Sequence, residues 1–479
     1  MSKAKTIPAW SMPPVYKQPN TLVIPLEIRL DKRLCPEVIA RINDGFSVYS
    51  KAYRTAFSRI NHGQRNLNQL TKDLQNEYGL KSRVANSISR DAQTRYKAGL
   101  ELARAQAGNL RASIIRKKKR MKKLQKAVDE KSKEAAANLL DDRELFYYHK
   151  RKEELWYLGQ RVLKQEARLK RWKKDLQDRH VRLCFGTKKL FKAQYHLEEN
   201  NLSSHEEWKE MFVKTRDRMM YLCGRNDEKN GNQLCHLIHM KDGSWRIGVL
   251  PILKSLEGRD RIITGPVRIT HNSGLELLNQ TFIGFEAEKP MKQAISVRIL
   301  RRQKGYYVEF YLHLPKPEGW NTSSFDGVIG LDFNADHIAL CETDRNGSIV
   351  HARRISLPGL GKKNHNYNQG ISHMMTAIKK ITTEARARGK DLVIEDLDFS
   401  EKKSDLKKNK NYNRMITQLA YGQYTHAVKR RCFKDNVDLK IVNPAYTSKK
   451  AKQTVCKELG INIHLGAACL IARRGLGLF

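Results

Sequence analysis

The hydrophobic positions of the chain follow three successive patterns. Thr21–Leu30 alternates apolar and polar residues, which is typical of a half-buried β-strand. From residue 37 to about residue 178, apolar positions recur at helical spacing and strong helix formers dominate. Beyond residue 180, short strand-like segments return between turn residues. The sequence therefore predicts a long helical block inserted between two parts of a β-rich region.

The helical block contains a basic stretch between two long amphipathic segments. We expect a first helix ending near Gly63, and long helices over Ser87–Leu110 and Ala137–Leu176. Between the last two lies Arg111–Lys126, which has nine basic residues and no acidic one. Such a run is often a solvated helix face, and the alternative is a helix that contacts phosphates. We favour phosphate contact through Lys117, Lys118, Lys119, Arg120, Lys122 and Lys123.

The region from about residue 179 to residue 318 is predicted to be mainly β-structure. After a helical segment over His205–Tyr221, we expect strands over Gln233–His239, Ser244–Pro251, Arg261–Thr270 and Thr281–Glu286, followed by a hairpin of Ala294–Arg301 and Tyr306–Leu314. Several short strands between turn signals indicate an antiparallel barrel or sandwich. The early strand Thr21–Leu30 is expected to join it.

A different order of elements follows a linker at residues 319–325. Val328–Phe333 is an apolar run whose only charge is Asp332, and two further strands, His337–Thr343 and Ser348–Leu357, follow it. A helix then leads to a buried strand that ends in Glu395. Three antiparallel strands, a crossover helix and a fourth strand parallel to the first are the order of an RNase H-like fold.

Asp332 and Glu395 would lie on neighbouring strands of such a sheet. Two carboxylates aimed at one point repel each other unless a divalent cation neutralises them, and hard oxygen ligands favour Mg²⁺ (or Mn²⁺) over Zn²⁺. Two such ions can activate a water and stabilise the leaving oxygen in phosphodiester cleavage. The simpler alternative is that Asp332 caps a strand end and Glu395 pairs with a lysine.

The composition limits the partners. The net charge is +41, from 91 Lys and Arg against 50 Asp and Glu. A compact chain with this charge repels itself unless a polyanion neutralises it, so nucleic acid is the favoured partner and binding should depend strongly on salt. An anionic membrane surface and a ribosomal location are the alternatives.

Other features of the sequence favour an intracellular location. No apolar segment reaches the roughly 18 residues of a membrane span, and the first ten residues lack the apolar core of a secretory signal. The eight cysteines are scattered without a CxxC pair, which argues against a disulfide framework and a cysteine-built zinc site. We therefore expect no membrane partner and a location in the reducing cytoplasm of a prokaryotic cell, at the nucleoid when DNA is bound.

Four C-terminal motifs carry a resemblance to a known family. GLDFNADHIAL, VIEDLDF, VNPAYTSK and HLGAACLIARRG, in this order within residues 326–479, resemble the TnpB family of transposon-encoded RNA-guided nucleases and the related compact type V CRISPR effectors. The resemblance implies an α+β multidomain protein. Its parts would be a wedge domain (1–36 and 179–318), an inserted helical recognition domain (37–178), a linker (319–325) and a RuvC nuclease domain (326–479).

The resemblance also implies the partners of the protein. They would be a guide RNA and a double-stranded target DNA, selected by base pairing beside a short adjacent motif. The origin of the guide, from a transposon end or a CRISPR array, stays open, and so does the choice between monomer and homodimer.

The catalytic residues can be carried over only in part. Asp332 and Glu395 match the first two RuvC carboxylates. At the position where the family has a third carboxylate, this chain has His464. Imidazole can ligate a metal, but it adds no negative charge and is a softer ligand for Mg²⁺. An active Asp–Glu–His site, a weakened nuclease and a binder without cleavage are therefore all possible, and we rank the active site first.

A second departure lies before the closing helix. The family has a four-cysteine zinc ribbon there, whereas Thr447–Gly460 is too short for one, so we expect no zinc. This segment is predicted to be a loop that contacts nucleic acid or is simply solvated. The residues expected to contact nucleic acid here are Tyr446, Lys449 and Lys450. Single-stranded DNA is expected to be guided by Lys402, Lys403, Lys407 and Lys408, with Tyr412, Tyr421 or Tyr424 as stacking residues.

Three functions remain in competition. The first is an RNA-guided DNA endonuclease with a metal-dependent RuvC site. The second is an RNA-guided DNA-binding repressor whose nuclease is weakened or lost. The third is a transposase or resolvase that uses the same fold without a guide. The high positive charge and the large non-catalytic part of the chain favour a guide.

Overall fold

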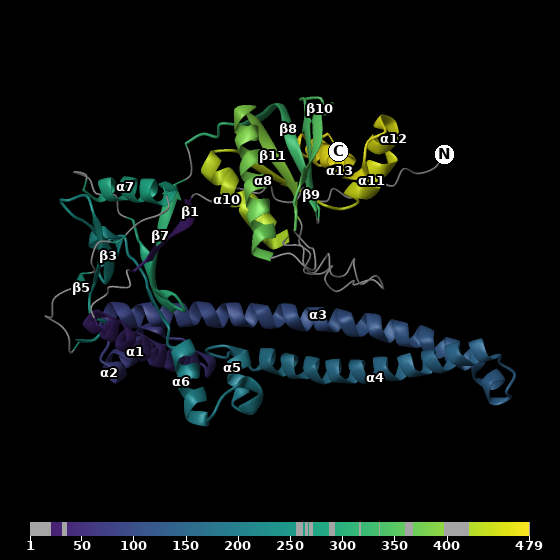
Figure 1. The fold of residues 1–479 in the computed structure, drawn as a ribbon, viewed down its shortest axis with the longest axis horizontal. Helices are drawn as coiled ribbons and strands as arrows, with labels where there is room; N and C mark the ends of the chain where they lie inside the picture. The colour runs from purple at the N-terminus through teal and green to yellow at the C-terminus, as the bar shows by residue number, and fades with distance from the viewer. Residues whose placement is uncertain are drawn as a thin grey trace. The chain divides into compact units, whose positions relative to one another are not determined.

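The chain has a mixed α/β fold that divides into two compact units. The computed structural model describes residues 21–30, 36–254, 262–263, 267, 272–286, 293–315, 318–334, 336–359, 367–396 and 421–478. One unit spans Val23–Leu314, and the other contains the chain from Pro315 onward (Figure 1). Within these described ranges, no helix is both long enough and apolar enough to span a membrane.

Four helices form the first part of the N-terminal unit: α1 (Pro36–Asn61), α2 (Leu67–Tyr78), α3 (Ser82–Ala136) and α4 (Asp142–Gln177). The helix predicted over Ser87–Leu110 is longer than expected, because it and the basic stretch belong to one helix of 55 residues. The predicted start of the next helix at Ala137 is wrong. Asp141 caps α4, where its carboxylate accepts a hydrogen bond from the backbone N–H of Glu144 at 2.7 Å.

Helices α3 and α4 lie side by side as a long antiparallel pair (Figure 1). The first turns of α3 are well supported, because Val84, Ile88 and Ala92 are buried where α3 packs on α1 and α2. Beyond Ala103, the buried residues of α3 are Ile114 and Val128. Hydrophobic burial is therefore concentrated at one end of the pair.

The strands of this unit form two open sheets. The first has the order β1-β7-β6-β2, and its members are β1 (Thr21–Arg29), β2 (Met219–Leu222), β6 (Ser296–Arg302) and β7 (Gly305–Pro315). The second consists of β3 (Cys235–His239), β4 (Trp245–Val249) and β5 (Ile262–Ile263). The early strand and the β6–β7 hairpin are confirmed. The predicted barrel is not, since the described strands leave both sheets open.

Two local predictions in this unit are wrong. The segment Thr281–Glu286 is the end of helix α7 (Asn272–Glu286) rather than a strand. Helix α6 (His205–Arg216) stops before the predicted end, and β2 follows it. A short apolar run fits a buried strand and a helix equally well, so periodicity alone could not separate them. A further short helix, α5 (Lys188–Ala193), lies in the segment where strand character was expected to begin.

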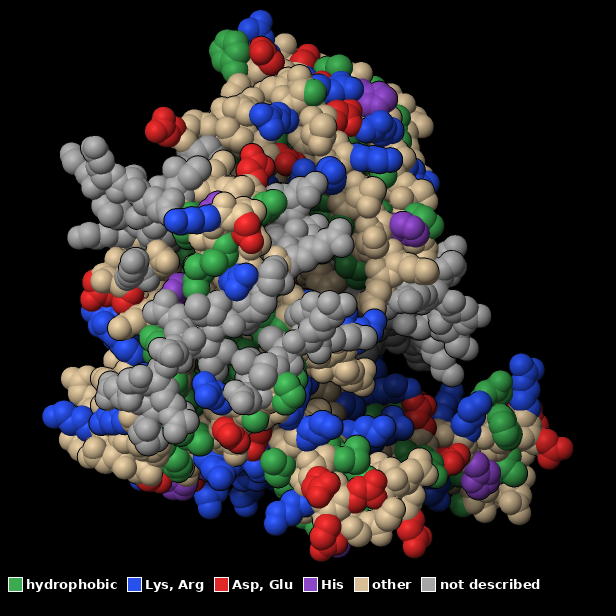
Figure 2. Space-filling view, turned by 60° about the vertical axis from the view of Figure 1, so that its left-hand side comes forward, with side chains coloured by type: hydrophobic (Ala, Val, Ile, Leu, Met, Phe, Trp, Pro, Cys, Tyr) green, Lys and Arg blue, Asp and Glu red, His purple; other side chains and the backbone are tan. Residues whose placement is uncertain are grey.

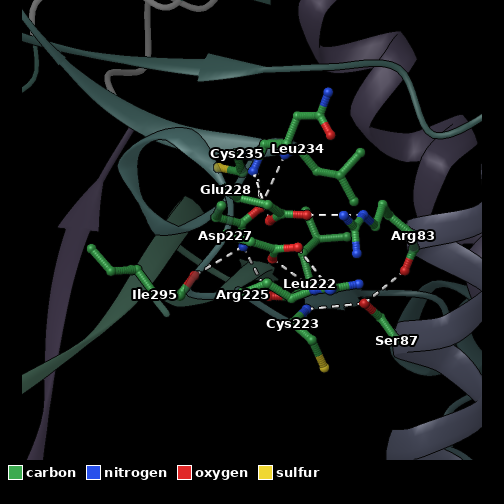
Figure 3. A network of polar contacts seen from close by, with 12 residues as sticks. Arg83, Ser87, Leu222, Cys223, Arg225, Asp227, Glu228, Leu234, Cys235 and Ile295 are labelled. Atoms are coloured by element: carbon green, nitrogen blue, oxygen red, sulfur yellow. Dashed lines mark hydrogen bonds and ion pairs between the residues drawn. The ribbon is translucent and has the colours of Figure 1, made fainter. Parts of the chain in front are cut away.

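A polar network connects the β2–β3 segment to the start of α3 (Figure 3). Arg83 forms an ion pair with Glu228 at 3.0 Å, and the Ser87 hydroxyl accepts a hydrogen bond from the backbone N–H of Cys223 at 3.0 Å. The side chain of Asn232 is fully buried and makes four hydrogen bonds to backbone groups. This network fixes the position of β2 beside α3.

The C-terminal unit contains a five-stranded sheet of order β10-β9-β8-β11-β12. Its members are β8 (Ser323–Phe333), β9 (His337–Thr343), β10 (Ile349–Ser356), β11 (Lys390–Glu395) and β12 (Leu439–Val442). Strands β8, β9 and β10 are antiparallel, and β11 is parallel to β8 and to β12. This is the predicted RNase H-like order. Strand β8 begins inside the predicted linker 319–325, and the domain boundaries otherwise stay a prediction.

Helices cover both faces of this sheet (Figure 1). Leu331, Phe333 and Ile394 point toward α8 (Tyr367–Ala387) and α10 (Tyr421–Asp435), with which they form the main core. Val328 and Val393 pack against α13 (Ile463–Gly475) on the opposite face. The predicted loop 447–460 instead contains two short helices, α11 (Thr447–Gln453) and α12 (Val455–Leu459).

Candidate active site

The site begins with a close contact between strand β8 and helix α13. A Cβ atom on Gly330 would lie 2.6 Å from the backbone nitrogen of Ala472 and closer still to the carbonyl oxygen of Ala468. No side chain fits between the two backbones, so the helix rests directly on the strand. Glycine at position 330 therefore sets the distance between α13 and the sheet.

This contact brings His464 to Asp332. Asp332 lies two residues beyond Gly330 on the same face of β8, and His464 lies one turn before Ala468 in α13. The Nδ1 atom of His464 is 3.3 Å from Oδ2 of Asp332. Asn462 caps the helix by accepting the backbone N–H of His464 at 2.9 Å. The carboxylate and the imidazole are thus placed together by backbone packing.

Glu395 lies beside Asp332 on the adjacent strand. Ile394 is opposite Leu331 in the parallel pair β8–β11, so the next residues in register are Glu395 and Asp332. Since alternate residues share a face of a sheet, both carboxylates are on the face covered by α13. The structure therefore brings the two predicted acids together at the carboxyl ends of two parallel strands.

Glu395 is buried and held by its neighbours. The Thr447 hydroxyl donates a hydrogen bond to its carboxylate, and Nη1 of Arg474 donates to the Thr447 hydroxyl at 2.6 Å. Burial lowers the pKa of the Arg474 guanidinium, and attraction to Glu395 opposes that shift. A threonine and an arginine thus hold this carboxylate in place.

Tyr424 lies on α10 near both acids. Its ring stacks on Phe333 with the centroids 4.0 Å apart, and the residue is 1% exposed. Burial raises the pKa of its hydroxyl, and the charges of Asp332 and Glu395 add to that rise. The hydroxyl oxygen is buried without a hydrogen-bond partner among the described residues. Of the three candidates for stacking on single-stranded DNA, Tyr424 is therefore not available, since its ring belongs to the core.

His337 was missed as a site residue by the sequence reasoning. Its ring contacts the ring of His464 edge to face, with the centroids 4.9 Å apart. Its Nδ1 atom lies 2.6 Å from Oδ1 of Asp336 and 3.1 Å from the guanidinium of Arg354. The Nε2 atom is buried with no partner within the described part of the chain. The sequence did contain a signal for it. His337 is the first residue of β9, and β9 is antiparallel to β8, so His337 must lie near the end of β8 where Asp332 is.

The donor set suits a hard divalent cation only in part. Two carboxylates in register provide the oxygen atoms that Mg²⁺ prefers. At the third position the imidazole of His464 is turned to Asp332. Among the described residues, no three His, Cys, Asp or Glu side chains converge as a ligand group. Asp332 and Glu395 are therefore the residues that would hold such an ion, and His464 is the uncertain third ligand.

The predicted basic helix face divides into two sets. Lys117 donates to Gln165 at 2.8 Å, Lys118 pairs with Glu166 at 2.6 Å, and Arg120 pairs with Glu154. These three residues connect α3 to α4. Lys119, Lys122 and Lys123 are exposed, without an ion pair to any described residue. Figure 2 shows that Lys and Arg side chains are widespread on the visible face, with acidic side chains between them.

The other predicted nucleic-acid contacts lie in or near α11. Tyr446 is 72% exposed and has a left-handed backbone conformation with φ of 60°. Lys449 and Lys450 are also exposed, so all three side chains are accessible to a ligand. Lys402, Lys403, Lys407 and Lys408 lie outside the described residues, as does Tyr412.

Comparison with solved structures finds weak similarity to RuvC and to two Cas12 proteins. Thermus thermophilus RuvC in complex with a Holliday junction substrate is 16% identical, over 32% of this chain and 96% of RuvC, with a TM-score of 0.23. A Cas12f ternary complex is 10% identical, over 94% of this chain and 98% of that one, with a TM-score of 0.20. A Cas12i–crRNA–dsDNA complex is 11% identical, over 85% of this chain and 52% of that one, with a TM-score of 0.24. Because these TM-scores are low, the fold assignment rests on the strand order and register.

Comparison with known sequences finds one partial match. No family model matches the chain. An uncharacterised protein of Saccharolobus solfataricus is 25% identical over 176 residues, which are 35% of this chain. The match covers 44% of that relative, less than half of its length.

Proposed function

We propose that this protein is an RNA-guided DNA endonuclease that cleaves phosphodiesters at the Asp332–Glu395 site. The observation that carries the proposal is the register of β8 and β11, which places the two carboxylates side by side at the ends of parallel strands. The net charge of +41 supports a nucleic-acid partner, and the motif resemblance supports a guide RNA. The target would be double-stranded DNA with a short adjacent motif.

The residues of the site have separable roles in this proposal. When bound, Mg²⁺ or Mn²⁺ would supply charge at the scissile phosphate and a more acidic water. Asp332 and Glu395 would hold the ion. Thr447, with Arg474 behind it, fixes the position of the Glu395 carboxylate. His464 is kept at Asp332 by the seating of α13, where it either ligates the ion or only positions the carboxylate.

A second candidate is favoured by the imidazole at position 464. Without a third carboxylate, the site has less negative charge to hold a divalent cation. The protein would then find DNA by guide pairing and act as a repressor, with cleavage weak or absent. A guide-free transposase or resolvase is the third candidate, and the copurifying nucleic acid separates it from the other two.

The test has two stages. Sequencing the nucleic acid that copurifies with the full chain should reveal a structured RNA of defined length, and its absence would exclude both guided functions. The RNA complex is then mixed with matching DNA and Mg²⁺. Wild type should cut at least about 100-fold faster than Asp332→Ala and Glu395→Gln, as expected for the loss of a group that holds the charge in the transition state. Asp326→Asn, at an exposed position on the same strand, is the control and should cut normally.

If wild type cuts no faster than Asp332→Ala, the endonuclease proposal fails and the repressor remains. DNA binding by the same complex, measured in parallel, shows whether that remaining function is present.

A further inference from the structure

The N-terminal unit contains a cavity that the nuclease site does not use. It has a volume of about 550 Å³ and lies between α1, α3, the start of β2 and the neighbouring strands β6 and β7. This volume is within the usual range for a small-molecule site. All of its lining residues belong to this one unit.

The lining has an excess of positive charge. It includes five arginines and one carboxylate, that of Asp91. Arg216 is neutralised by Asp217 at 2.8 Å, and Arg298 by Glu309 at 3.1 Å. The remaining three are Arg90, Arg95 and Arg218, which are exposed. Against one Asp91 they leave a net positive site, which favours an anionic ligand.

Aromatic rings form the other part of the lining. Tyr49 and Tyr53 are stacked with centroids 6.2 Å apart, and Phe185 meets Tyr53 edge to face at 5.8 Å. Across the cavity, Tyr311 lies under the guanidinium of Arg298, 5.4 Å from the ring centroid. Flat rings beside arginines are the combination that holds nucleobases by stacking and phosphates by charge.

Two polar side chains of the lining, Asp91 and Arg298, can accept or donate further hydrogen bonds. Burial raises the pKa of Asp91, while a hydrogen bond from Tyr53 and the charge of Arg95 oppose the rise. An ionised carboxylate has about four acceptor sites, so donors from a ligand would stabilise it further. The Nε–H of Arg298 is also buried without a partner among the described residues.

We propose that this cavity binds one unpaired nucleotide of the nucleic acid that the protein carries, with the base beside Tyr53 and the phosphate at Arg90 and Arg218. The preferred base is guanine, because its N1–H and N2–H are parallel donors that match the two oxygens of the Asp91 carboxylate. The inference rests on the proposed function for the source of the nucleotide. The binding chemistry itself does not depend on cleavage.

The test uses the full chain, freed of nucleic acid at high salt and returned to moderate salt. Calorimetric titration with GMP should give one saturable site, with UMP binding more weakly. Arg90→Gln and Arg218→Gln should each weaken GMP binding about 5-fold or more, since each removes a charge-assisted contact to the phosphate. Arg104→Gln is the matched control, because Arg104 is exposed on the same helix but does not line the cavity.

Asp91→Asn tests the base. An amide presents a donor where the carboxylate presents an acceptor, so the preference for GMP over UMP should disappear while the fold, monitored by circular dichroism, is kept. The proposal is overturned if no nucleotide binds saturably, if Arg104→Gln weakens binding as much as Arg90→Gln, or if Asp91→Asn keeps the guanine preference.

The source of the nucleotide is tested by competition. The RNA that copurifies should displace GMP if one of its nucleotides occupies the cavity. Continued GMP binding in the RNA complex would overturn this assignment and indicate a free nucleotide instead. Neither result depends on DNA cleavage, so failure of the cavity proposal and failure of the endonuclease proposal are distinguishable.

Discussion

The imidazole of His464 and the carboxylate of Asp332 are in direct contact, with Nδ1 3.3 Å from Oδ2. The residue at the third position of the site therefore touches the first acid. Asn334 also donates to the same oxygen, at 2.9 Å. Two nitrogen atoms thus contact Oδ2 of Asp332. This oxygen can bind a cation only if the side chains of Asn334 and His464 move away from it.

His464→Asp should strengthen the site if a divalent cation is used. The substitution adds a third carboxylate on a helix whose position is fixed by Gly330, so we expect the Mg²⁺ concentration for half-maximal cutting to fall about 10-fold or more. His464→Ala should raise it if the imidazole is a ligand. His351→Asp, an exposed change of the same charge in the same unit, is the control. Unchanged Mg²⁺ dependence in both His464 variants would remove this residue from the site.

Gly330→Ala and Gly108→Ala should have opposite effects on stability. At Gly330 the added methyl group meets the backbone of α13, so we expect a loss of about 1–3 kcal/mol in the free energy of unfolding. At Gly108, inside α3, the new methyl group meets nothing within 4 Å beyond the local backbone of its own helix, so we expect a gain of about 0.5–1 kcal/mol. Thermal unfolding of both variants measures this. Equal effects would show that α13 is not seated on Gly330.

The two sets of basic residues on α3 should behave differently. Replacing Lys119, Lys122 and Lys123 with glutamine should weaken RNA binding and lower the slope of log K against log salt by about 2, because each single-strand phosphate contact contributes about 0.7. Replacing Lys118 and Arg120 should instead weaken the α3–α4 pairing, seen as lower thermal stability. A salt slope that is unchanged in the triple variant would exclude phosphate contact by these lysines.

The N-terminal unit should lose stability in alkali through Tyr311. Burial raises the pKa of its hydroxyl to about 12, and the hydrogen bond to Glu309 adds to the rise. Because the folded state disfavours the phenolate, this contribution is complete below the ordinary pKa of about 10 and is lost as the pH rises from 10 to 12. Tyr311→Phe should flatten the stability profile in that window, measured by denaturant unfolding. Tyr195→Phe, at an exposed position, should not.

The sheet that holds the two acids could be predicted from the sequence because its signals are local. Apolar runs, a turn at Asp344–Gly347 and one helix of clear periodicity fix the order from β8 to β11, and the order places Asp332 beside Glu395. The role of Gly330 could not be predicted in this way, since a close approach between two backbones leaves no periodic trace in either segment.

The extent of α3 and the position of Tyr424 could not be predicted from sequence patterns. The helix expected over Ser87–Leu110 continues as α3 to Ala136, because the basic stretch that follows has no capping residue or glycine to end it. The stacking of Tyr424 on Phe333 depends on a tertiary contact between α10 and the end of β8. Helix periodicity alone does not reveal which face of α10 meets the sheet.

The length of helix α3 affects how firmly its outer part is held. At about 1.5 Å per residue, its 55 residues extend about 80 Å, yet its hydrophobic anchoring is concentrated at one end. Farther out, exposed ion pairs such as Lys118–Glu166 and Lys131–Glu144 join α3 to α4, beside a few buried apolar residues. Exposed pairs are screened by salt, whereas buried apolar contacts are not. The outer part of the helix pair is thus held in part by contacts that salt weakens, so its stiffness should fall as the ionic strength of the solution rises.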